Sequence, residues 1–321
     1  MFTENKSISI SSLGETKLIA QIRRWLGDVT PPSPEGMGDD CAVVTVPQGK
    51  QILTSDSLSY GQHFDHNIDP KDAGAKLIKR NLSDIAAMGA TAKCYTLSLT
   101  IPELDKEWLK DFSSSLKESS KLFNVDLIGG DTTKGPLNIS INMMGSIEIN
   151  SPIKRSGANE GDDIYVSGEL GSAALCLKKI KKGEMPLESD LNSLNRPIPR
   201  LELGSALKNL ASSCIDVSDG LEQDLSHILK SSGVGAIIDT QELPLSDSVI
   251  HYVKDKNDWS LPLCGGDDYE LCFTAGKSKR DKISAISESL GIRVTRIGEI
   301  NSQKKLEVVG YTGPRTSYQH F

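Results

Sequence analysis

The chain has 321 residues, of which 37% are hydrophobic and 25% charged, and its formal net charge at pH 7 is −7. This length suits two domains better than one core. The acidic balance argues against nucleic-acid binding, which needs a basic surface, and an aromatic content of 5% offers few stacking residues for single strands. No stretch of 18 apolar residues occurs, so we expect no membrane-spanning helix.

The first 150 residues alternate between helical and strand-like patterns. Helical periodicity of apolar residues predicts helices over 15–27, 71–90 and 105–123. Strand-like runs occupy 42–46, 51–56, 94–101 and 137–149, and the run 94–101 alternates strictly between apolar and polar residues. A further run predicts a strand over 125–128 that ends in a glycine turn at Gly129 and Gly130.

A domain boundary is predicted at residues 151–163, SPIKRSGANEGDD, which combine Pro, Gly and charges without an apolar period. Strands and helices alternate again beyond this segment. Expected strands cover 163–167, 215–217, 235–239, 269–274 and 294–300, and expected helices cover 169–183, 221–233 and 282–291. The sequence therefore predicts a mixed α/β (or α+β) protein with two domains, 1–150 and 151–321.

The cysteines and the first residues favour an intracellular location. The six cysteines form no C-x-x-C pair and have no spacing typical of zinc ligands, and most lie within apolar runs. Buried thiols of this kind are usual in reducing compartments. The opening MFTENKSISISS lacks the basic start and apolar core of a signal peptide. We therefore expect a cytoplasmic protein.

Short acidic motifs recur along the chain. They are GMGDD at 36–40, TSDS at 54–57, NLSD at 81–84, GGDTTKG at 129–135, DVSDG at 216–220 and GGDDYE at 265–270. Any single motif is compatible with a simple turn, because Asp and Asn side chains hydrogen-bond to nearby backbone and cap helices. Together, and with several following strand-like runs, they favour a shared functional cluster, since loops after strands build the active sites of α/β folds.

Magnesium bound together with a polyphosphate fits these motifs better than calcium does. No stretch has EF-hand spacing, although DVSDGLEQD comes nearest. Mg²⁺ takes one or two carboxylates and completes its octahedron with water and phosphate oxygens. Divalent ions are also needed to bring phosphates beside carboxylates, because like charges 4 Å apart repel by about 4 kcal/mol at an effective dielectric of ~20. The glycine pairs before Asp131 and Asp267 would let backbone N–H groups approach phosphate oxygens.

The common catalytic motifs are missing from the sequence. AGKSK contains the end of a Walker A motif, but Leu271 stands where its first glycine is required. G-x-G-x-x-G, the protein-kinase motifs, H-E-x-x-H and G-x-S-x-G are also missing. An ATP-using enzyme with this sequence must therefore have a less common fold. His63, which follows Asp56 by seven residues, is a candidate for contact with a substrate.

Seven segments occur in the order GMGDDCAVV, TSDSLSYGQHF, KRNLSDIAAMGA, LIGGDTTKG, RPIPRLELG, CIDVSDGL and GGDDYELCFT. Together they resemble the thiamine-monophosphate kinases, a family of the aminoimidazole-ribonucleotide-synthetase-like superfamily, from about Gly14 to the C-terminus. The resemblance implies phosphate transfer from ATP to thiamine monophosphate, giving thiamine diphosphate and ADP. It also implies a homodimer in which strands of both N-terminal domains form a β-barrel, a C-terminal α/β domain, and substrates held between the domains.

The resemblance also implies roles for individual residues. Expected magnesium ligands are Asp40, Thr54, Ser55, Asp56, Asp84, Asp131, Asp216 and Asp219. Expected ATP contacts are Gly130, Asp131, Arg155 and Ser218. Expected contacts with thiamine monophosphate are His63, Asp267 and Tyr318. The substrate contacts depart most from the family pattern, which often has GGEDYE in place of GGDDYE and an acid in place of Gln319.

A direct transfer assisted by several Mg²⁺ ions needs no acid or base from the protein. The attacking phosphate monoester has a second pKa of about 6, so it is largely deprotonated at pH 7. The protein must then position two anions in line and neutralise their charge. Two alternatives stay open: another ATP-using enzyme of the superfamily, such as a cyclo-ligase or a selenophosphate synthetase, and a non-catalytic nucleotide or metal sensor. The leader lacks the reactive Cys of the synthetase, and the intact aspartates argue against a sensor.

Overall fold

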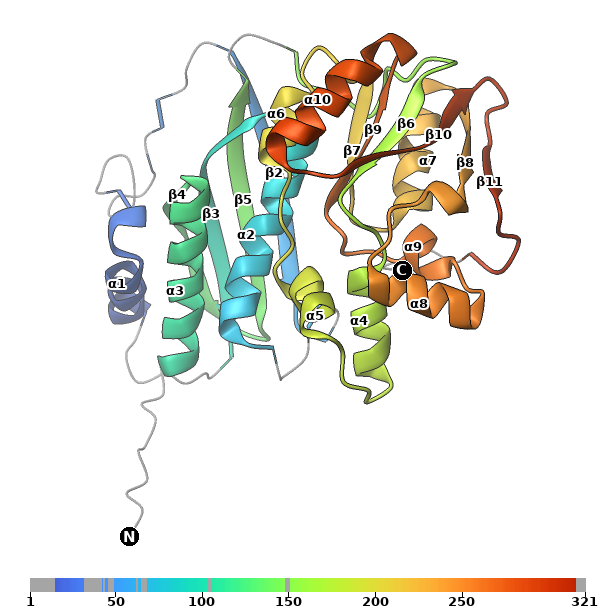
Figure 1. The fold of residues 1–321 in the computed structure, drawn as a ribbon. Helices are drawn as coiled ribbons and strands as arrows, with labels where there is room; N and C mark the ends of the chain where they lie inside the picture. The colour runs from blue at the N-terminus through green and yellow to red at the C-terminus, as the bar shows by residue number, and fades with distance from the viewer. Residues whose placement is uncertain are drawn as a thin grey trace. The chain divides into compact units, whose positions relative to one another are not determined.

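The computed structural model describes residues 15–31, 42, 44, 45, 49–61, 63, 64, 68–102, 106–147 and 151–315 (Figure 1). Contacts divide the chain into two units, Met1–Leu82 with Ala92–Glu148 and Ser83–Thr91 with Ile149–Phe321. The last residues of one long helix therefore belong with the second unit. Over the described ranges, no helix is both long enough and apolar enough to cross a membrane.

The first unit is built on a four-stranded sheet. The strands are β2 (Lys50–Ser59), β3 (Thr91–Ile101), β4 (Asp126–Lys134) and β5 (Asn138–Ile147), in the order β2-β5-β3-β4. β2 and β5 are antiparallel, whereas β3 and β4 are parallel. A parallel pair needs a crossover, which the helix α3 (Lys106–Phe123) provides. The described strands form an open sheet and not a closed barrel.

Helices cover one face of this sheet. The apolar residues of β3 that were predicted to alternate, among them Tyr95 and Leu97, are all buried. Tyr95 reaches α3, where its hydroxyl lies 2.8 Å from the Ser120 hydroxyl. α2 (Pro70–Ala87) packs beside α3, and α1 (Glu15–Leu26) packs on α3. The three helices lie where the apolar period predicted them, which confirms those expectations.

The expected glycine turn at Gly129 and Gly130 is wrong, because both residues lie within β4. The register between β3 and β4 shifts at Tyr95, so β4 carries an extra residue just before the glycines. A Cβ on Gly130 would overlap the backbone carbonyl of Leu97 on β3. The glycine is therefore needed for close approach of two strands. TSDS likewise lies inside β2 and not at its end.

The second unit has a six-stranded mixed sheet. Its strands are β6 (Asp163–Ser167), β7 (Ser213–Val217), β8 (Gly235–Asp239), β9 (Glu270–Ala275), β10 (Val294–Asn301) and β11 (Leu306–Val309). They lie in the order β11-β8-β10-β6-β9-β7, and only the β11–β8 pair is parallel. The strands β6 and β9 and the edge strand β7 are buried along their whole length, as in a sheet covered on both faces.

Each face of this sheet has its own core. Ile164 and Val166 of β6 pack in the cluster that contains α7 (Leu221–Ser232), α8 (Asp247–Lys256) and α9 (Ser260–Cys264). Tyr165, which points the opposite way, packs with α6 (Leu201–Ala206) and α10 (Arg280–Leu290) and stacks on Phe273 with ring centres 5.1 Å apart. The remaining helices are α4 (Ser172–Lys181) and α5 (Glu188–Asn195), with the short 3-10 helices Gly27–Val29, Thr240–Glu242 and Lys277–Lys279.

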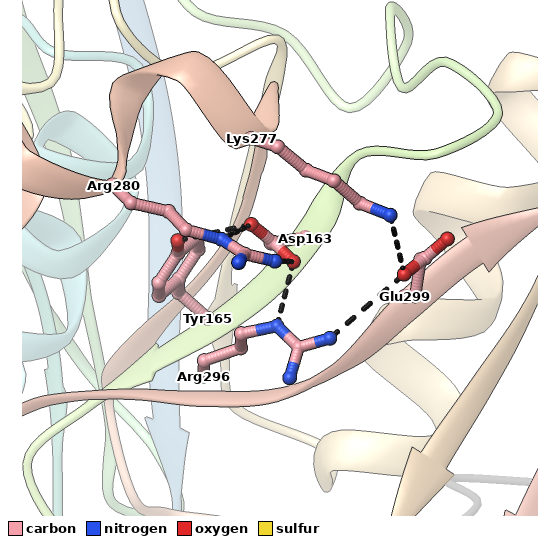
Figure 2. Close-up of polar contacts among 6 residues, drawn as sticks. All are labelled: Asp163, Tyr165, Lys277, Arg280, Arg296 and Glu299. Carbon is pink, nitrogen blue, oxygen red and sulfur yellow. Dashed lines mark hydrogen bonds and ion pairs between the residues drawn. The ribbon is translucent and has the colours of Figure 1, made fainter.

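A buried carboxylate at the start of β6 ties three elements of the second unit together (Figure 2). Asp163, whose side chain has no exposed surface, accepts two hydrogen bonds of 2.7 Å from Arg280 and one of 2.6 Å from Arg296. Burial alone would raise the pKa of this carboxyl, but the hydrogen bonds and charges of the two arginines outweigh it and lower the pKa to about 2.

We expect this group to make the protein sensitive to acid. Because the pKa of Asp163 is lower in the folded than in the unfolded chain, its contribution is complete above about pH 4 and is lost as the pH falls towards 2. The loss should be on the order of 1–2 kcal/mol, since both arginines are half exposed. Urea unfolding at pH 7, 4 and 3 should show a weaker pH dependence for Asp163→Asn than for wild type. Asp247→Asn, at an exposed position of α8, is the control, and equal slopes for all three proteins would contradict the assignment.

Candidate active site

The second unit brings Asp216, Ser218 and Asp219 into one short connection between a strand and a helix. Asp216 lies at the end of β7 and is 5% exposed, and the loop after it leads into α7. Gly220 ends this loop with φ +115°, and a Cβ there would lie 2.7 Å from the carbonyl carbon of Cys264. The predicted strand, acidic loop and helix are therefore confirmed.

The GGDDYE segment lies against this loop. The backbone N–H of Asp267 donates to the Ser218 carbonyl at 2.9 Å, and that of Tyr269 donates to the Val217 carbonyl at 2.8 Å. A Cβ on Gly266 would lie 2.5 Å from the same Ser218 carbonyl oxygen, so a glycine permits this close approach. Two motifs that are about 50 residues apart in the sequence thus form one surface, with Asp267 beside the Asp216–Asp219 loop.

The GGDDYE segment has a strained backbone at two residues other than glycine. Asp267 has φ +71° and Tyr269 has φ +52°, values that cost about 1 kcal/mol or more for such side chains. Tyr269 is 2% exposed, and its hydroxyl donates to Asp267 Oδ1 at 2.8 Å. Strain of this kind persists when surrounding contacts impose it, and it is frequent at functional sites. Here the strained backbone and the Tyr269 hydroxyl together hold the carboxylate of Asp267 in one orientation.

Asp268, between these two residues, anchors the segment to the start of α4. Both of its carboxyl oxygens lie 3.0 Å from the backbone N–H of Gly171, which donates to them. Burial raises the pKa of Asp268 well above its usual range, and the nearby carboxylates of Glu270 and Asp267 raise it further. Sequence reasoning assigned no role to Asp268, although its place inside an acidic motif was a usable signal.

A buried ion pair joins the GGDDYE and RPIPR segments. Arg200 donates to Glu270 through Nε at 2.7 Å and through Nη2 at 2.5 Å. Ser167 of β6 donates to the same carboxylate at 2.5 Å and accepts from the Leu271 N–H at 2.9 Å. A Cβ on Gly168 would overlap the Glu270 carboxylate. The RPIPR segment, which had no expected role, therefore supports the start of β9 at the end of the GGDDYE segment.

The first unit places Thr54, Ser55 and Asp56 in consecutive positions of β2, so Thr54 and Asp56 share one face and Ser55 lies on the other. The Asp56 side chain is 29% exposed, and its Oδ1 lies 3.6 Å from Nη2 of Arg80 on α2. Thr54 and Ser55 help to line a hollow of about 360 Å³ that also contains Tyr95. Thr54 and Asp56 thus present side-chain oxygens on one face of β2, and Ser55 presents its hydroxyl on the other.

α2 presents a second acidic position. Asp84 lies in the last turns of this helix, and Asn81 precedes it by three residues, so the two side chains share one side of the helix. The Asn81 amide nitrogen donates to the Leu77 carbonyl at 2.9 Å. Its oxygen is buried, and no described residue donates a hydrogen bond to it. A buried acceptor without a donor, one turn from a carboxylate, fits an oxygen-seeking cation.

Asp131 lies apart from Asp56 in the first unit. It is exposed on β4, opposite Ser98 of β3, and Gly130 lies opposite Leu97. β2 and β4 are the outer strands of the described sheet, with β5 and β3 between them. Three strand spacings separate their backbones by about 14 Å. The sheet of the first unit therefore does not place Asp56 and Asp131 around one ion.

The other predicted positions are distributed as follows. His63 accepts a hydrogen bond of 3.0 Å at Nδ1 from the Ser59 N–H, which makes Nε2 the protonated nitrogen of a neutral ring. Arg155 is exposed beside the beginning of β7, where the Lys154 carbonyl accepts from the Cys214 N–H, so it lies at the end of β7 opposite to Asp216. Asp40 and Tyr318 lie outside the described residues.

The donor set is chemically suited to magnesium. Carboxylate, hydroxyl and amide oxygens predominate, and Mg²⁺ prefers such ligands over nitrogen or sulfur. Over the described residues, no group of three or more His, Cys, Asp or Glu side chains is arranged as a metal centre. A Mg²⁺ ion bound to any of these residues would therefore take one or two protein oxygens and complete its coordination shell with water or phosphate oxygens. This coordination is usual for Mg²⁺ in nucleotide-binding sites.

Comparison with known proteins identifies the family of the chain. Residues 38–147 match the family model of the AIR synthase related protein, N-terminal domain, and residues 159–310 match that of the C-terminal domain. The chain is thus built as an AIR synthase related protein. A thiamine-monophosphate kinase of Salmonella typhimurium is 41% identical over 295 residues, which are 90% of this chain and 91% of that protein. The chain therefore belongs to the thiamine-monophosphate kinase family.

Two solved structures have the same fold. The crystal structure of thiamine-monophosphate kinase from Stenotrophomonas maltophilia K279a has a TM-score of 0.84 and 37% identity, and the match covers 94% of this chain and 98% of that one. AaThiL complexed with AMPPCP and TMP has a TM-score of 0.77 and 28% identity, with 99% of this chain and 100% of that one covered.

Proposed function

We propose that the protein transfers the terminal phosphate of ATP to thiamine monophosphate, giving thiamine diphosphate and ADP. One observation carries this proposal: backbone hydrogen bonds join the DVSDG and GGDDYE segments. Asp267, the proposed substrate contact, therefore lies beside the loop of Asp216, Ser218 and Asp219, the proposed metal and nucleotide contacts. Family membership supports the same reaction, and a related structure holds an ATP analogue, AMPPCP, together with TMP. We also propose that the reaction takes place in the cytoplasm, where ATP is supplied.

We assign the nucleotide and substrate contacts to different residues, as the family resemblance implies. Ser218, Gly130, Asp131 and Arg155 would contact ATP. His63, Asp267 and Tyr318 would contact thiamine monophosphate. The neutral tautomer of His63 has Nε2–H as its donor, which suits an acceptor atom of the substrate. Asp267 is held by Tyr269, so a carboxylate one methylene shorter than the family's usual Glu still has a fixed direction.

Magnesium would be held by Asp40, Thr54, Ser55, Asp56, Asp84, Asp131, Asp216 and Asp219. When bound, several Mg²⁺ ions would neutralise the phosphate charges of both substrates and polarise the bond that breaks. The chain itself supplies the rigid supports: β2 fixes Thr54 to Asp56, and α2 fixes Asp84. Asn81 offers a further buried oxygen beside Asp84.

We propose direct in-line transfer without a phospho-enzyme. The acceptor phosphate is already a dianion at neutral pH for the most part, so the protein needs no general base to activate it. Its contribution is to align two anions and to surround them with compensating charge, including that of Arg155. Rapid-quench labelling with γ-³²P-ATP should leave no phosphate on the protein. A trapped phosphoprotein that forms and decays at the rate of turnover would contradict direct transfer.

We further propose a homodimer in which the open sheet of the first unit joins that of a second copy to form a barrel. The support is the sheet itself: β2 carries Leu53, which is 72% exposed, and the apolar hollow next to it contains Met144. Exposed apolar surface on a strand invites pairing or covering. Light scattering of the purified protein should give twice the chain mass.

The function is tested by measuring both products. Purified protein with ATP and Mg²⁺ should release ADP and form thiamine diphosphate with thiamine monophosphate, but not with thiamine or with aminoimidazole ribonucleotide precursors. ADP release that depends on an aminoimidazole precursor would favour a cyclo-ligase. Binding of Mg²⁺·ATP without any turnover would favour a nucleotide sensor.

A further inference from the structure

Asp224, in the first turn of α7, binds the backbone of the acidic loop. Its Oδ2 accepts hydrogen bonds from three consecutive N–H groups, those of Ser218 and Asp219 at 3.0 Å and that of Gly220 at 3.1 Å. The side chain is 3% exposed. Consecutive N–H groups that converge in this way form a concave site for an anion. In this protein the anion is a carboxylate of the chain itself.

These hydrogen bonds do not serve the helix in the usual way. A capping side chain satisfies the first N–H groups of the helix, which have no partner within it. α7 begins at Leu221, and all three donors precede it in the chain. The carboxylate therefore reaches backwards out of the helix and fixes the shape of the loop that carries Ser218 and Asp219.

The neighbouring residue Gln223 fixes a side chain of the same loop. Its amide nitrogen donates to Oδ2 of Asp219 at 3.0 Å. One oxygen of Asp219 is thus held by Gln223, and the backbone of Asp219 is held by Asp224. Two consecutive residues of α7 together determine where the Asp219 carboxylate points.

A carboxylate at position 224 is unfavourable for folding, so its presence is not explained by stability. Asp224 is buried and faces the negative charge of Asp219, and burial followed by that charge outweighs the stabilising N–H groups, so the pKa of Asp224 is raised to about 7. Asp268 also lies within electrostatic reach of Asp224. Buried acidic groups near one another are unfavourable for folding, and they are retained at sites where geometry matters.

We propose that Asp224, assisted by Gln223, is a positioning residue that holds the Asp216–Gly220 loop in the conformation that binds the metal–nucleotide complex. This proposal rests on the proposed function, because Asp216, Ser218 and Asp219 are its nucleotide and metal contacts. It adds a consequence: the three N–H groups of the loop are occupied by Asp224, so they do not bind phosphate. The loop therefore does not offer the nucleotide the free N–H groups of the usual anion site at the start of a helix.

The test compares Asp224→Ala, Asp224→Asn and Gln223→Met with Asp190→Ala. Asp190 is the matched control, because it is a buried aspartate, 1% exposed, that accepts hydrogen bonds from Lys179 and Ser248 away from the loop. Hydrogen exchange without nucleotide should accelerate over residues 218–220 in Asp224→Ala and not in the control. Calorimetric titration with Mg²⁺·AMPPCP should show affinity weakened about tenfold or more in Asp224→Ala, and less in Gln223→Met.

Asp224→Asn retains an acceptor oxygen and should recover both the slow exchange and most of the affinity. An Asn variant with slow exchange but weak binding would overturn the proposal, and so would Asp224→Ala with the affinity of wild type. If Asp224→Ala does not fold, the affinity of Gln223→Met for Mg²⁺·AMPPCP decides, because the Gln223 side chain is partly exposed. An affinity equal to that of wild type would then contradict the proposal. Failure of the proposed function is seen separately, since wild type would then bind no Mg²⁺·AMPPCP or form no thiamine diphosphate.

Discussion

Asp56→Asn should reduce turnover about a hundredfold or more, which corresponds to about 2.7 kcal/mol of transition-state free energy. The substitution replaces an anionic oxygen of β2 by a neutral one and so weakens the hold on a divalent ion next to the phosphates. The melting temperature should stay near that of wild type. The Arg80 side chain is 12% exposed, but its pair with Asp56 is long, at 3.6 Å, and Asp56 is 29% exposed, so we expect the loss of the pair to cost only about 1 kcal/mol.

Asp28→Asn is the matched control for this prediction. Asp28 also belongs to the first unit and pairs with Lys121 at 2.9 Å, but it lies after α1 and is 67% exposed. It should retain full turnover. Steady-state formation of thiamine diphosphate and thermal unfolding, measured on both variants, give the answer. If Asp56→Asn keeps normal turnover, Asp56 holds no essential ion; if it mainly loses stability, its role is structural.

Features with a local cause could be predicted from the sequence. The helix α3 was predicted because its apolar residues recur with the helical period, and β3 because apolar and polar residues alternate along it. The DVSDG loop was predicted because glycine and aspartate follow a buried run. In each case the pattern that predicts the element lies within about 20 consecutive residues, and the structure has that element at the predicted place.

Features that depend on distant residues could not be predicted in the same way. Gly130 suggested a turn, yet it lies in β4 because Leu97, 33 residues earlier, comes too close for a side chain. In the sequence, Asp224 belongs to the stretch DVSDGLEQD, which fails as a calcium loop, and its hydrogen bonds to three N–H groups exist only in the folded chain. The sequence identifies which residue types suit the chemistry, and folding decides which of them meet.

The RPIPR segment illustrates the same limit. Nothing in its composition indicates a partner, because Arg200 precedes Glu270 by 70 residues. Glu270 is the last residue of the GGDDYE segment and the first residue of β9, and the folded chain brings Arg200 within hydrogen-bond distance of it. Arg200 thus supports the GGDDYE segment from outside, and both segments belong to one arrangement around Asp267.

Glu270→Gln should lower the free energy of unfolding by about 3 kcal/mol, because removing one partner of a buried ion pair leaves the other charge uncompensated. Arg200 is 16% exposed, and Ser167 also loses its charged acceptor. For a unit of this size, the melting temperature should fall by about 6–12 °C. Glu299→Gln is the control, because its pair with Lys277 is 2.9 Å long but exposed, at 37% and 51%, and should cost less than about 1 kcal/mol.

The double variant Arg200→Met with Glu270→Gln separates the ion pair from the rest of the site. If the uncompensated charge of Arg200 causes the loss, removing that charge as well should restore part of the stability. Turnover at a temperature where both variants are folded should stay below that of wild type, since the strained Asp267–Tyr269 backbone continues directly into Glu270. Equal stability of Glu270→Gln and wild type would show instead that Arg200 finds sufficient solvation without its partner, and the RPIPR segment would then lack the supporting role assigned to it.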